Sequence, residues 1–509
     1  MSRQVLLGID IGTSSSKGVL VSADGELLAQ ASRPHRTSTP RPGWVEHDAE
    51  TVWWADFTAI ARELVDAADG RELAGLGVSG IGPCVLPADA DGRPLRPAIL
   101  YGVDTRATVE IDELTAELGA DAILQRCGMR LTTQAVGPKL RWLARHEPEV
   151  AVATRRLLMA SSYLVARLTG RYVLDHHSAS QSAPLYDLAA QSWHAGWAGQ
   201  VAPRLELPEL VWPTEVAGTV TAAGAAETGL PEGLPVTAGT VDAWAEATSV
   251  GVREPGDMMV MYGTTMFLVQ MVQKVRPHPG LWGTVGTLPG SYSVAAGMAT
   301  SGAVTDWLRN LVGGEFAALV AEAGQVPAGS RGLLLLPYFA GERTPVFDPD
   351  ARGILAGLTT SHTRADIYRA ALEGTAFGVR HNLEAMADAG GDLRRLVAVG
   401  GGTQGDLWTQ IVSDVTGTPQ DLCRHTVGAC FGDAMLAALA TGTGTDPWSW
   451  NPVVRRLTPD PERHTRYDAF YSRYRELYES TKDIAHFLAA EQHAAAEHAP
   501  DLQERIDKS

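Results

Sequence analysis

Cysteine is scarce in this chain of 509 residues. It has four, none of them in a Cys-x-x-Cys pair: Cys84, Cys127, Cys423 and Cys430. So few thiols argue against a disulfide scaffold and against a zinc module, and they are typical of a chain kept in a reducing compartment. We therefore expect a cytoplasmic protein.

Long apolar runs and positive charge are lacking as well. No stretch reaches the roughly 18 apolar residues of a membrane span, and no signal-like apolar segment precedes Asp10. Lys and Arg number 42 against 59 Asp and Glu, which gives a net charge of −17. Because a nucleic-acid binder needs a basic face, we expect neither nucleic-acid nor membrane partners. A phosphate ligand held by backbone amides and a metal stays compatible with this charge.

Two well-known phosphate-handling motifs are missing. The chain has no G-x-x-x-x-G-K-[ST] stretch, which excludes a P-loop ATPase. It has no His-Arg-Asp or Asp-Phe-Gly triplet, which excludes a protein kinase. Glycine is abundant, with 53 residues, so tight turns and close backbone contacts are expected. The length predicts two or three domains.

The chain opens as a β-meander followed by a helix. Asp24-Gly25 is a strong hairpin signal among three predicted strands, at residues 5–9, 17–22 and 26–31. Asp48 marks a helix N-terminus, because the apolar positions after it share one helical face; they are Trp53, Phe57, Ile60 and Leu64. A further strand is predicted at residues 74–79.

The turn after the first strand carries the residues of a phosphate site. Asp10 ends the strand, Gly12 permits an unusual turn conformation, and hydroxyls and a cation surround the tip: Thr13, Ser14, Ser15, Ser16 and Lys17. Exposed backbone N–H groups can cradle a polyphosphate, and Asp10 can hold hydrated Mg²⁺. An ordinary hairpin explains the same residues, so both interpretations stand at this point.

A similar hairpin recurs at mid-chain. Residues 257–262 and 266–272 read as its strands, and Gly263, Thr264 and Thr265 form its tip. The second hairpin lies about half the chain length after the first, which favours a degenerate internal duplication. Two such tips can face each other across a cleft and clamp one triphosphate.

Asp242 is a candidate general base. It follows a predicted strand at residues 234–237 and begins a predicted helix. A carboxylate at a helix N-terminus is kept ionised by the helix dipole, and it can accept a proton from a substrate hydroxyl. A plain helix cap is the competing interpretation.

Residues 400–405 fit the pattern G-x-G-x-x-G between a predicted strand and a predicted helix. With Asp421 nearby, a dinucleotide site of an NAD-dependent oxidoreductase is an alternative function. A glycine strip against which an adenine lies flat fits equally well. Farther on, residues 467–478 carry an aromatic stripe at helical spacing, which we interpret as core packing.

Together these features resemble the FGGY family of carbohydrate kinases over roughly residues 3–485. Residues 138–148 are similar to the first family signature and residues 353–373 to the second, and both signatures are mainly structural. The stretch Gly341-Glu-Arg-Thr-Pro345 and residues 43–47 are also typical. The resemblance implies an α/β, two-lobed actin-like or ribonuclease-H-like ATPase fold with a nucleotide cleft between lobes at residues 1–245 and 246–488. We expect the tail, residues 489–509, to be frayed.

The resemblance also implies roles for matched positions. Asp242 corresponds to the catalytic base, and Asp10, which we expect to hold the metal, matches the first phosphate loop. Nucleotide contacts are implied for Asp10, Gly12, Thr13, Ser14, Lys17, Gly263, Thr264, Thr265, Gly302, Gly401, Gly402 and Asp406. Substrate contacts are expected for Trp44, Ser79, Gly82, Tyr101, Asp104, Arg106 and Asp242, although Asp104 and Arg106 could equally pair with each other. One departure is that Gly82-Pro83-Cys84 stands where xylulokinases carry a sugar-contacting Met-His pair.

The implied reaction is ATP-dependent phosphorylation of a terminal hydroxyl on a small sugar, such as a xylulose- or ribulose-type ketopentose, or on a polyol. ATP and Mg²⁺ are the implied cofactors. Two alternatives remain, the NAD-dependent oxidoreductase and a non-catalytic actin-like sugar sensor that binds ATP. A homodimer is left open.

Overall fold

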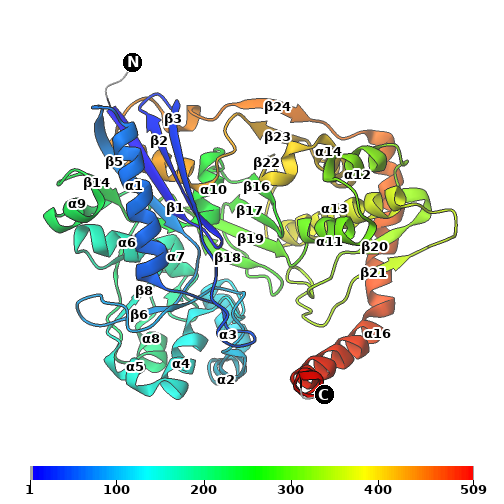
Figure 1. The fold of residues 1–509 in the computed structure, drawn as a ribbon, viewed down its shortest axis with the longest axis horizontal. Coiled ribbons are helices and arrows are strands. Elements are labelled where there is room, and N and C mark those ends of the chain that lie inside the picture. The colour runs from blue at the N-terminus through cyan, green and yellow to red at the C-terminus, as the bar shows by residue number, and fades with distance from the viewer. Residues whose placement is uncertain (1–3, 508–509) are drawn as a thin grey trace.

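Two lobes, each built on a seven-stranded sheet, make up the fold (Figure 1). The structure is a computed structural model that describes the backbone of residues 4–507 and the side chains of residues 4–495. The helices α10 (Asp242–Ser249) and α15 (Ala429–Thr441) pack against each other between the two sheets.

The N-terminal sheet contains the predicted meander. Its strand order is β13-β14-β5-β1-β2-β3, and β15 (Thr240–Val241) pairs with β5. The strands are β1 (Gln4–Ile11), β2 (Ser15–Ser22), β3 (Leu27–Pro34), β5 (Glu72–Gly80), β13 (Val216–Thr219) and β14 (Pro235–Thr237). β1, β2 and β3 are antiparallel neighbours, whereas β5 runs parallel to β1. The predicted strands therefore exist, with ends one to three residues longer or shorter.

The C-terminal sheet repeats this topology. Its order is β18-β19-β17-β16-β22-β23-β24. The strands are β16 (Asp257–Tyr262), β17 (Met266–Val272), β18 (Trp282–Val285), β19 (Tyr292–Met298), β22 (Arg395–Val399), β23 (Gln420–Cys423) and β24 (Val453–Leu457). β16 pairs antiparallel with β17 and parallel with β22, as β1 does with β2 and β5. The predicted internal duplication is confirmed for the hairpin of each half and for the parallel strand beside it.

Helices cover both faces of the N-terminal sheet, so β1 is buried along nearly its whole length. One face carries α1 (Ala55–Ala67), which begins after a short π-helix, Ala49–Trp54, capped by Asp48. The other face carries α15, although α15 lies more than 400 residues after β1 in the sequence. The helix can approach β1 this closely because residue 8 is a glycine: a Cβ at this position would lie only 1.9 Å from the Cys430 carbonyl oxygen.

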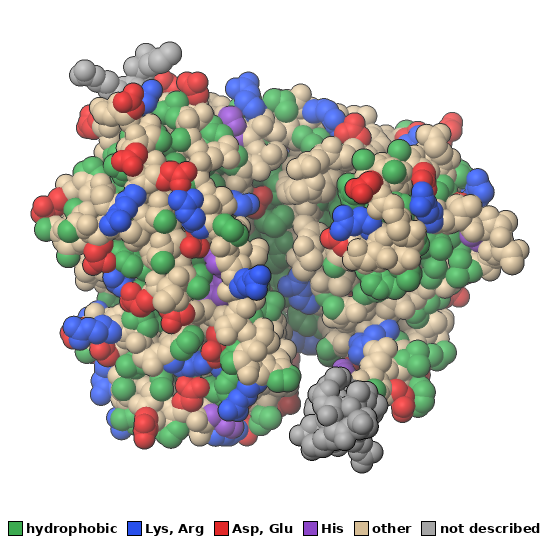
Figure 2. Space-filling model, in the orientation of Figure 1, with side chains coloured by type: hydrophobic (Ala, Val, Ile, Leu, Met, Phe, Trp, Pro, Cys, Tyr) green, Lys and Arg blue, Asp and Glu red, His purple; other side chains and the backbone are tan. Residues whose placement is uncertain are grey.

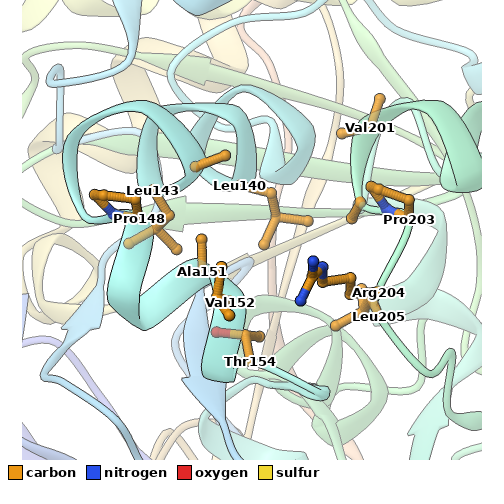
Figure 3. A pocket seen from close by; sticks show the side chains of 12 residues that line it. Leu140, Leu143, Pro148, Ala151, Val152, Thr154, Val201, Pro203, Arg204 and Leu205 are labelled. Atoms are coloured by element: carbon orange, nitrogen blue, oxygen red, sulfur yellow. The ribbon is translucent and has the colours of Figure 1, made fainter.

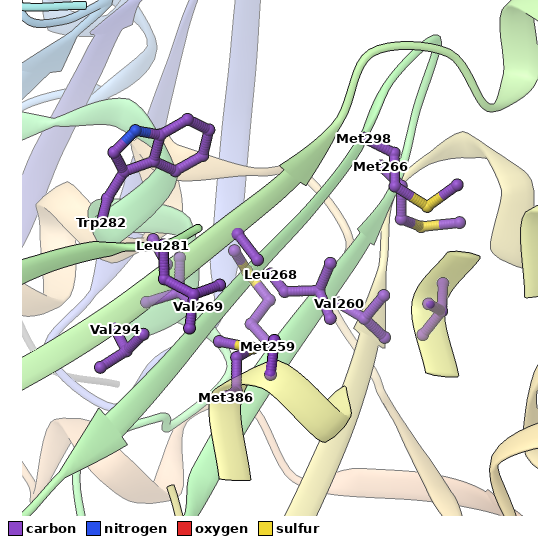
Figure 4. Packing of buried hydrophobic residues seen from close by; sticks show 14 of the residues in the cluster. Met259, Val260, Met266, Leu268, Val269, Leu281, Trp282, Val294, Met298 and Met386 are labelled. Atoms are coloured by element: carbon purple, nitrogen blue, oxygen red, sulfur yellow. The ribbon is translucent and has the colours of Figure 1, made fainter. Parts of the chain in front are cut away.

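The C-terminal core is rich in methionine and aliphatic residues (Figure 4). Met259, Val260, Leu268 and Met298 are fully buried. The strand neighbours Met259 and Val260 face opposite sides of the sheet, and α13 (Arg364–Asp388) packs on the side of Met298, since a Cβ on Gly378 would lie 2.3 Å from its terminal methyl group. The aromatic stripe lies on α16 (Pro461–Asp507), where Tyr467 and Tyr474 are fully buried, so its interpretation as core packing is confirmed. The backbone of α16 continues to Asp507, past the point where we expected fraying, and residues 508–509 lie outside the described chain.

Candidate active site

The molecule is hollowed between its two halves (Figure 2). A cavity of about 270 Å³ lies there, and both lobes contribute to its wall. The N-terminal lobe provides Asp10, Lys17, Gly82, Tyr101 and Asp242, and the C-terminal lobe provides Thr265. Six residues that the sequence predicts for the site therefore share one wall.

Asp242 is the first residue of α10, directly after β15. Its Oδ1 accepts a hydrogen bond of 2.7 Å from the N–H of Ala243. The sequence predicts that the helix dipole keeps this carboxylate ionised, but burial acts in the opposite direction and raises the pKa of Asp242 to about 6. The group is therefore still mostly ionised at neutral pH, while its proton affinity is raised toward the working range of a general base.

Two more carboxylates share the cavity with Asp242. Asp10 is the second-last residue of β1 and is buried, and this burial, reinforced by the nearby Asp242 charge, raises its pKa well above the ordinary value. Glu246 lies one helical turn after Asp242, and burial together with the Asp242 charge raises its pKa to about 7. Lys17 is a nearby cation that acts on both groups. The cavity wall thus carries three carboxylates against two cationic side chains, Lys17 and Arg343.

Ser79 does not lie where the sequence analysis places it. We expected a substrate contact, but Ser79 is fully buried behind the cavity wall. Its Oγ lies 3.1 Å from Oδ1 of Asp10 and 2.7 Å from Oδ2 of Asp433, a residue of α15. Ser79 therefore anchors Asp10 instead of meeting a ligand, and it links β5 to a helix from the far end of the chain.

The first phosphate hairpin, residues 12–15, joins β1 to β2. The N–H of Gly12 donates to the carbonyl of Ser15 at 3.1 Å, which closes the turn. Glycine is needed here for close approach, since a Cβ would lie 2.7 Å from that carbonyl; the predicted unusual φ is wrong, because Gly12 does not have a positive φ. The Thr13 hydroxyl lies 2.9 Å from the hydroxyl of Tyr101, and Ser14 is exposed.

The second phosphate hairpin, residues 263–265, joins β16 to β17. Its carbonyl groups are bound by the backbone at the start of α11 (Gly302–Val312). The N–H groups of Ser301 and Ala303 donate to the carbonyl of Thr264, and that of Gly302 donates to the carbonyl of Gly263 at 3.0 Å. A Cβ on Gly302 would lie 2.6 Å from the Gly263 oxygen, so glycine is required there. Gly302 therefore supports the hairpin through its backbone.

The predicted adenosine strip lies beside the second hairpin. Gly400 has a φ of 91°, and the Gly401–Gln404 turn precedes α14 (Asp406–Thr416). A Cβ on Gly402 would lie 2.8 Å from the side chain of Tyr262, the residue before the hairpin tip. A Cβ on Gly401 would meet nothing within 4 Å, so one face of the strip is open. Asp406 is exposed and pairs with Arg455 at 2.6 Å.

The acidic residue that a dinucleotide site would need, Asp421, is not free to bind a ligand. Asp421 would have to be free to bind a ribose, but its side chain is only 3% exposed. Arg456 donates to both of its carboxylate oxygens, and Arg395 donates to Oδ2. The carboxylate is thus occupied by two guanidinium groups.

Asp104 and Arg106 pair with each other. Both side chains are fully buried, and Nη2 of Arg106 lies 2.7 Å from Oδ2 of Asp104. The ring of Trp44 packs on the Arg106 guanidinium, whose centre lies 4.2 Å from the ring centroid. None of the three is among the residues that line the cavity. The structural alternative of the sequence analysis therefore fits these residues.

Several cavity residues were not predicted. Besides Glu246, they include Gln134, Gln181 and Arg343. Arg343 is half-buried; it donates to the Met298 carbonyl at 2.9 Å, and its Nε has no partner in the described structure. Glu246 could have been found from its spacing, since residues four apart share a helix face. The others come from distant segments that no local pattern joins.

The two signature stretches, residues 138–148 and 353–373, have charged side chains that are bound within the lobes. Lys139, in α4 (Val136–His146), is buried, which lowers its pKa to about 8, and it donates to the Thr133 carbonyl at 2.7 Å. Glu373, in α13, accepts hydrogen bonds from Ser330, Arg369 and Tyr467. Both are engaged with the protein, which agrees with their predicted structural role.

A second cavity, of about 200 Å³, lies in the N-terminal lobe (Figure 3). It is lined by apolar side chains, among them Leu140, Leu143, Val152 and Val201, and Arg204 lies at one side. No aspartate or glutamate lines it. Because phosphoryl transfer to an alcohol needs a group that accepts the hydroxyl proton, this apolar cavity is not the candidate active site.

Comparison with known proteins identifies the family. The sequence profile described as the FGGY family of carbohydrate kinases, N-terminal domain, matches residues 5–249, and that of the C-terminal domain matches residues 258–441. Xylulose kinase of Escherichia coli is 29% identical over 93% of this chain and 98% of its own. Glycerol kinase of Nocardia farcinica is 31% identical over 94% of this chain and 100% of its own.

The solved structures agree with the sequence relatives. The crystal structure of xylulose kinase from Rhodospirillum rubrum is 35% identical, with a TM-score of 0.88 over 95% of this chain and 100% of that chain. Within the described residues, no helix combines the length and apolar character needed to cross a membrane.

The two family matches replace the sensor and oxidoreductase alternatives: the chain belongs to the FGGY family of carbohydrate kinases, which phosphorylate sugars or polyols with ATP.

Proposed function

We propose that this kinase transfers the terminal phosphoryl group of ATP to a terminal hydroxyl of a ketopentose of the xylulose or ribulose type. The observation that carries the proposal is Asp242, a half-buried carboxylate on the wall of a small cavity between the lobes. The volume of about 270 Å³ lies near the lower end of ligand pockets, which suits a small sugar and not an oligosaccharide.

The cavity residues divide the work of the reaction. Asp242 accepts the proton of the substrate hydroxyl while that oxygen attacks the γ-phosphorus and ADP leaves. Polar side chains of Tyr101, Gln134, Gln181 and Arg343 supply donors and acceptors for the other sugar hydroxyls. The two phosphate hairpins approach from opposite lobes, so their backbone amides hold the triphosphate between them. Closure of the lobes would exclude water from the transferring group.

The donor set also fits a magnesium ion. No group of three or more His, Cys, Asp or Glu side chains in the described chain is arranged to hold a metal by itself. Mg²⁺ is commonly held by one or two carboxylates together with phosphates and waters, so this arrangement suits it. Asp10, with Glu246 nearby, would hold the ion, which would neutralise charge on the phosphates.

A polyol is the second candidate substrate. It is supported by the glycerol kinase relative, whose identity is close to that of the xylulose kinases. It is also supported by the wall at Gly82-Pro83-Cys84, where the polar pair of xylulokinases is missing and Gly82 lines the cavity.

The proposal is tested by a coupled ADP-release screen. The panel contains D- and L-xylulose, D- and L-ribulose, ketohexoses, tetritols, pentitols and glycerol, each with and without Mg²⁺. A kcat/KM at least about tenfold higher for a ketopentose than for any polyol or hexose supports the proposal. The highest value for glycerol or a tetritol would replace it with the polyol alternative. Mass analysis of the product then identifies the phosphorylated hydroxyl.

A further inference from the structure

His35 contacts the first phosphate hairpin but does not line the cavity. It follows β3 directly, and its backbone N–H donates to the carbonyl of Ser14 at 3.0 Å. Its ring Nε2 lies 3.1 Å from the carbonyl oxygen of Gly12, and its ring Nδ1 lies 2.8 Å from Oδ2 of Asp56, on α1. One residue therefore holds two carbonyl groups of the hairpin and ties them to a helix.

Both ring nitrogens of His35 face acceptors. A backbone carbonyl has no proton to give, and Oδ2 of Asp56 also accepts a hydrogen bond of 2.8 Å from the Ser16 hydroxyl. A neutral imidazole has only one N–H, so it cannot donate to both partners. The contacts fit an imidazolium ion, whose charge is balanced by the Asp56 carboxylate. The His35 side chain is 7% exposed and that of Asp56 is 16% exposed, so the pair is largely shielded from solvent.

A second titratable side chain contacts the His35–Asp56 pair but carries no charge that would repel the His35 ring. His47, on β4 (Glu46–His47), lies edge-on to His35 with ring centroids 5.0 Å apart. Burial, and then the neighbouring charge of His35, lower the pKa of His47 to about 4. His47 is therefore neutral at physiological pH, and its Nδ1 accepts a hydrogen bond from Trp53. The positive charge of His35 meets no like charge from this neighbour.

The contacts fix the direction of hairpin amides. In a trans peptide the C=O and the following N–H point to opposite sides. Because the carbonyls of Gly12 and Ser14 are held toward His35, the N–H groups of Thr13 and Ser15 point away from it. Backbone N–H groups that share one side of a turn are the usual means of binding a phosphate without basic side chains.

We propose that His35, as an imidazolium held by Asp56, is a positioning residue for phosphoryl transfer: it orients the first phosphate hairpin so that its amides receive the nucleotide phosphates. The inference rests on the kinase activity but not on the identity of the sugar, because neither His35 nor Asp56 lines the cavity. Binding of Mg-ADP without any sugar is therefore the appropriate readout, and its failure is distinguishable from failure of the substrate screen.

The first experiment compares His35→Ala with Arg36→Ala by calorimetric titration of Mg-ADP into the full chain. Arg36 is the exposed next residue and serves as the matched control. Loss of the charge-assisted contacts should weaken Mg-ADP binding by about tenfold or more in His35→Ala and by less than about twofold in the control. Free imidazole should restore part of the affinity in His35→Ala. A folded His35→Ala protein with wild-type affinity would overturn the proposal.

The second experiment replaces the Asp56 partner at one fixed pH near neutrality. Asp56→Ala removes the acceptor that holds Nδ1 of His35, so Mg-ADP affinity should fall by about threefold or more. In the isosteric Asp56→Asn, the side-chain amide can donate to Nδ1 while Nε2 donates to Gly12, so the affinity should stay within about twofold of wild type. Wild-type affinity in a folded Asp56→Ala protein would overturn the assignment. This comparison also decides the matter if His35→Ala does not fold.

Discussion

At the residue scale, Asp242 is the proposed acceptor of the substrate hydroxyl proton. Asp242→Asn keeps the shape and the Ala243 hydrogen-bond acceptor but cannot take up the hydroxyl proton. We expect kcat to fall by about 10²- to 10⁴-fold while the dissociation constant for Mg-ADP changes less than about twofold. Asp446→Asn, in an exposed helix-capping aspartate, is the control. A kcat within about threefold of wild type would show that another group accepts the proton.

The same carboxylate predicts an acidic limb in the pH profile. The pKa of Asp242 is about 6, and the base acts only when ionised. Below pH 6, kcat/KM should therefore fall about tenfold for each pH unit, whereas it should be level near pH 7 to 8. Initial rates at saturating Mg-ATP, measured in buffers of constant ionic strength, check this expectation. A level profile down to about pH 5 would contradict it.

Glu246 predicts a pH-dependent stability. Its pKa is about 7 in the folded chain, above the ordinary value, so the folded state binds the proton more tightly than the unfolded state does. The stabilisation from its protonation is present at low pH and is lost as the pH rises from about 4.5 to 7. Glu246→Gln should therefore raise the free energy of unfolding by about 1 to 3 kcal/mol more at pH 8 than at pH 5.

Urea unfolding of the metal-free protein at both pH values measures this difference. Glu232→Gln, at an exposed glutamate, is the matched control and should show no dependence on pH. The same change in unfolding free energy at pH 5 and pH 8 in Glu246→Gln would mean that the carboxylate is hydrated in solution and not buried.

The candidate site was predictable where its residues are close in sequence. Asp10 and the two hairpin tips are contiguous patterns of strand, glycine and hydroxyl residues, and Asp242 stands at a visible strand-to-helix junction. Ser79 was assigned the wrong role because its partner Asp433 lies 354 residues away. Arg343 was noted only as part of a family-type stretch, since nothing local to it indicates that it reaches the cavity.

At the element scale, local sequence patterns predicted the strands but not how the helices pack on them. The meander and the second hairpin were predicted to within a few residues, because turn residues and apolar runs mark them clearly. The packing of α15 on β1, β5 and α10 could not be predicted, since it depends on glycines in three separate segments. A Cβ on Gly77 would lie 1.9 Å from the Asp433 carbonyl oxygen, and one on Gly432 would lie 1.8 Å from that of Ala245.

This packing predicts the effect of a single methyl group. Gly432→Ala should force α10 and α15 apart, because the contact is with backbone and cannot be relieved by a rotamer change. We expect a loss of about 2 to 4 kcal/mol in unfolding free energy and a fall in kcat, since α10 carries Asp242. Gly199→Ala, in α8 (Ala195–Val201), is the control because its Cβ would meet nothing within 4 Å. Equal stabilities for the two variants in urea titrations would contradict the packing argument.

At the scale of the whole molecule, the negative net charge of the chain and the carboxylates of the cavity both disfavour binding of an anionic ligand. The chain carries a net charge of −17, and the cavity wall contains three carboxylates, Asp10, Asp242 and Glu246, against two cations, Lys17 and Arg343. A nucleotide polyphosphate adds several more negative charges. Backbone amides of the two hairpins offer dipoles but no full charge. A divalent cation is the simplest way to make the combination favourable.

Removal of the cation should therefore weaken nucleotide binding strongly. With EDTA in place of Mg²⁺ at equal ionic strength, we expect ADP to bind at least about thirtyfold more weakly, measured by calorimetry at pH 8. Lowering the pH to about 6 should recover part of the affinity without metal, because Asp242 and Glu246 then take up protons. Equal affinity with and without Mg²⁺ would mean that Lys17, Arg343 and the backbone amides suffice to neutralise the phosphates. In that case Asp10 would be a positioning group for the hairpin and not a ligand of the metal.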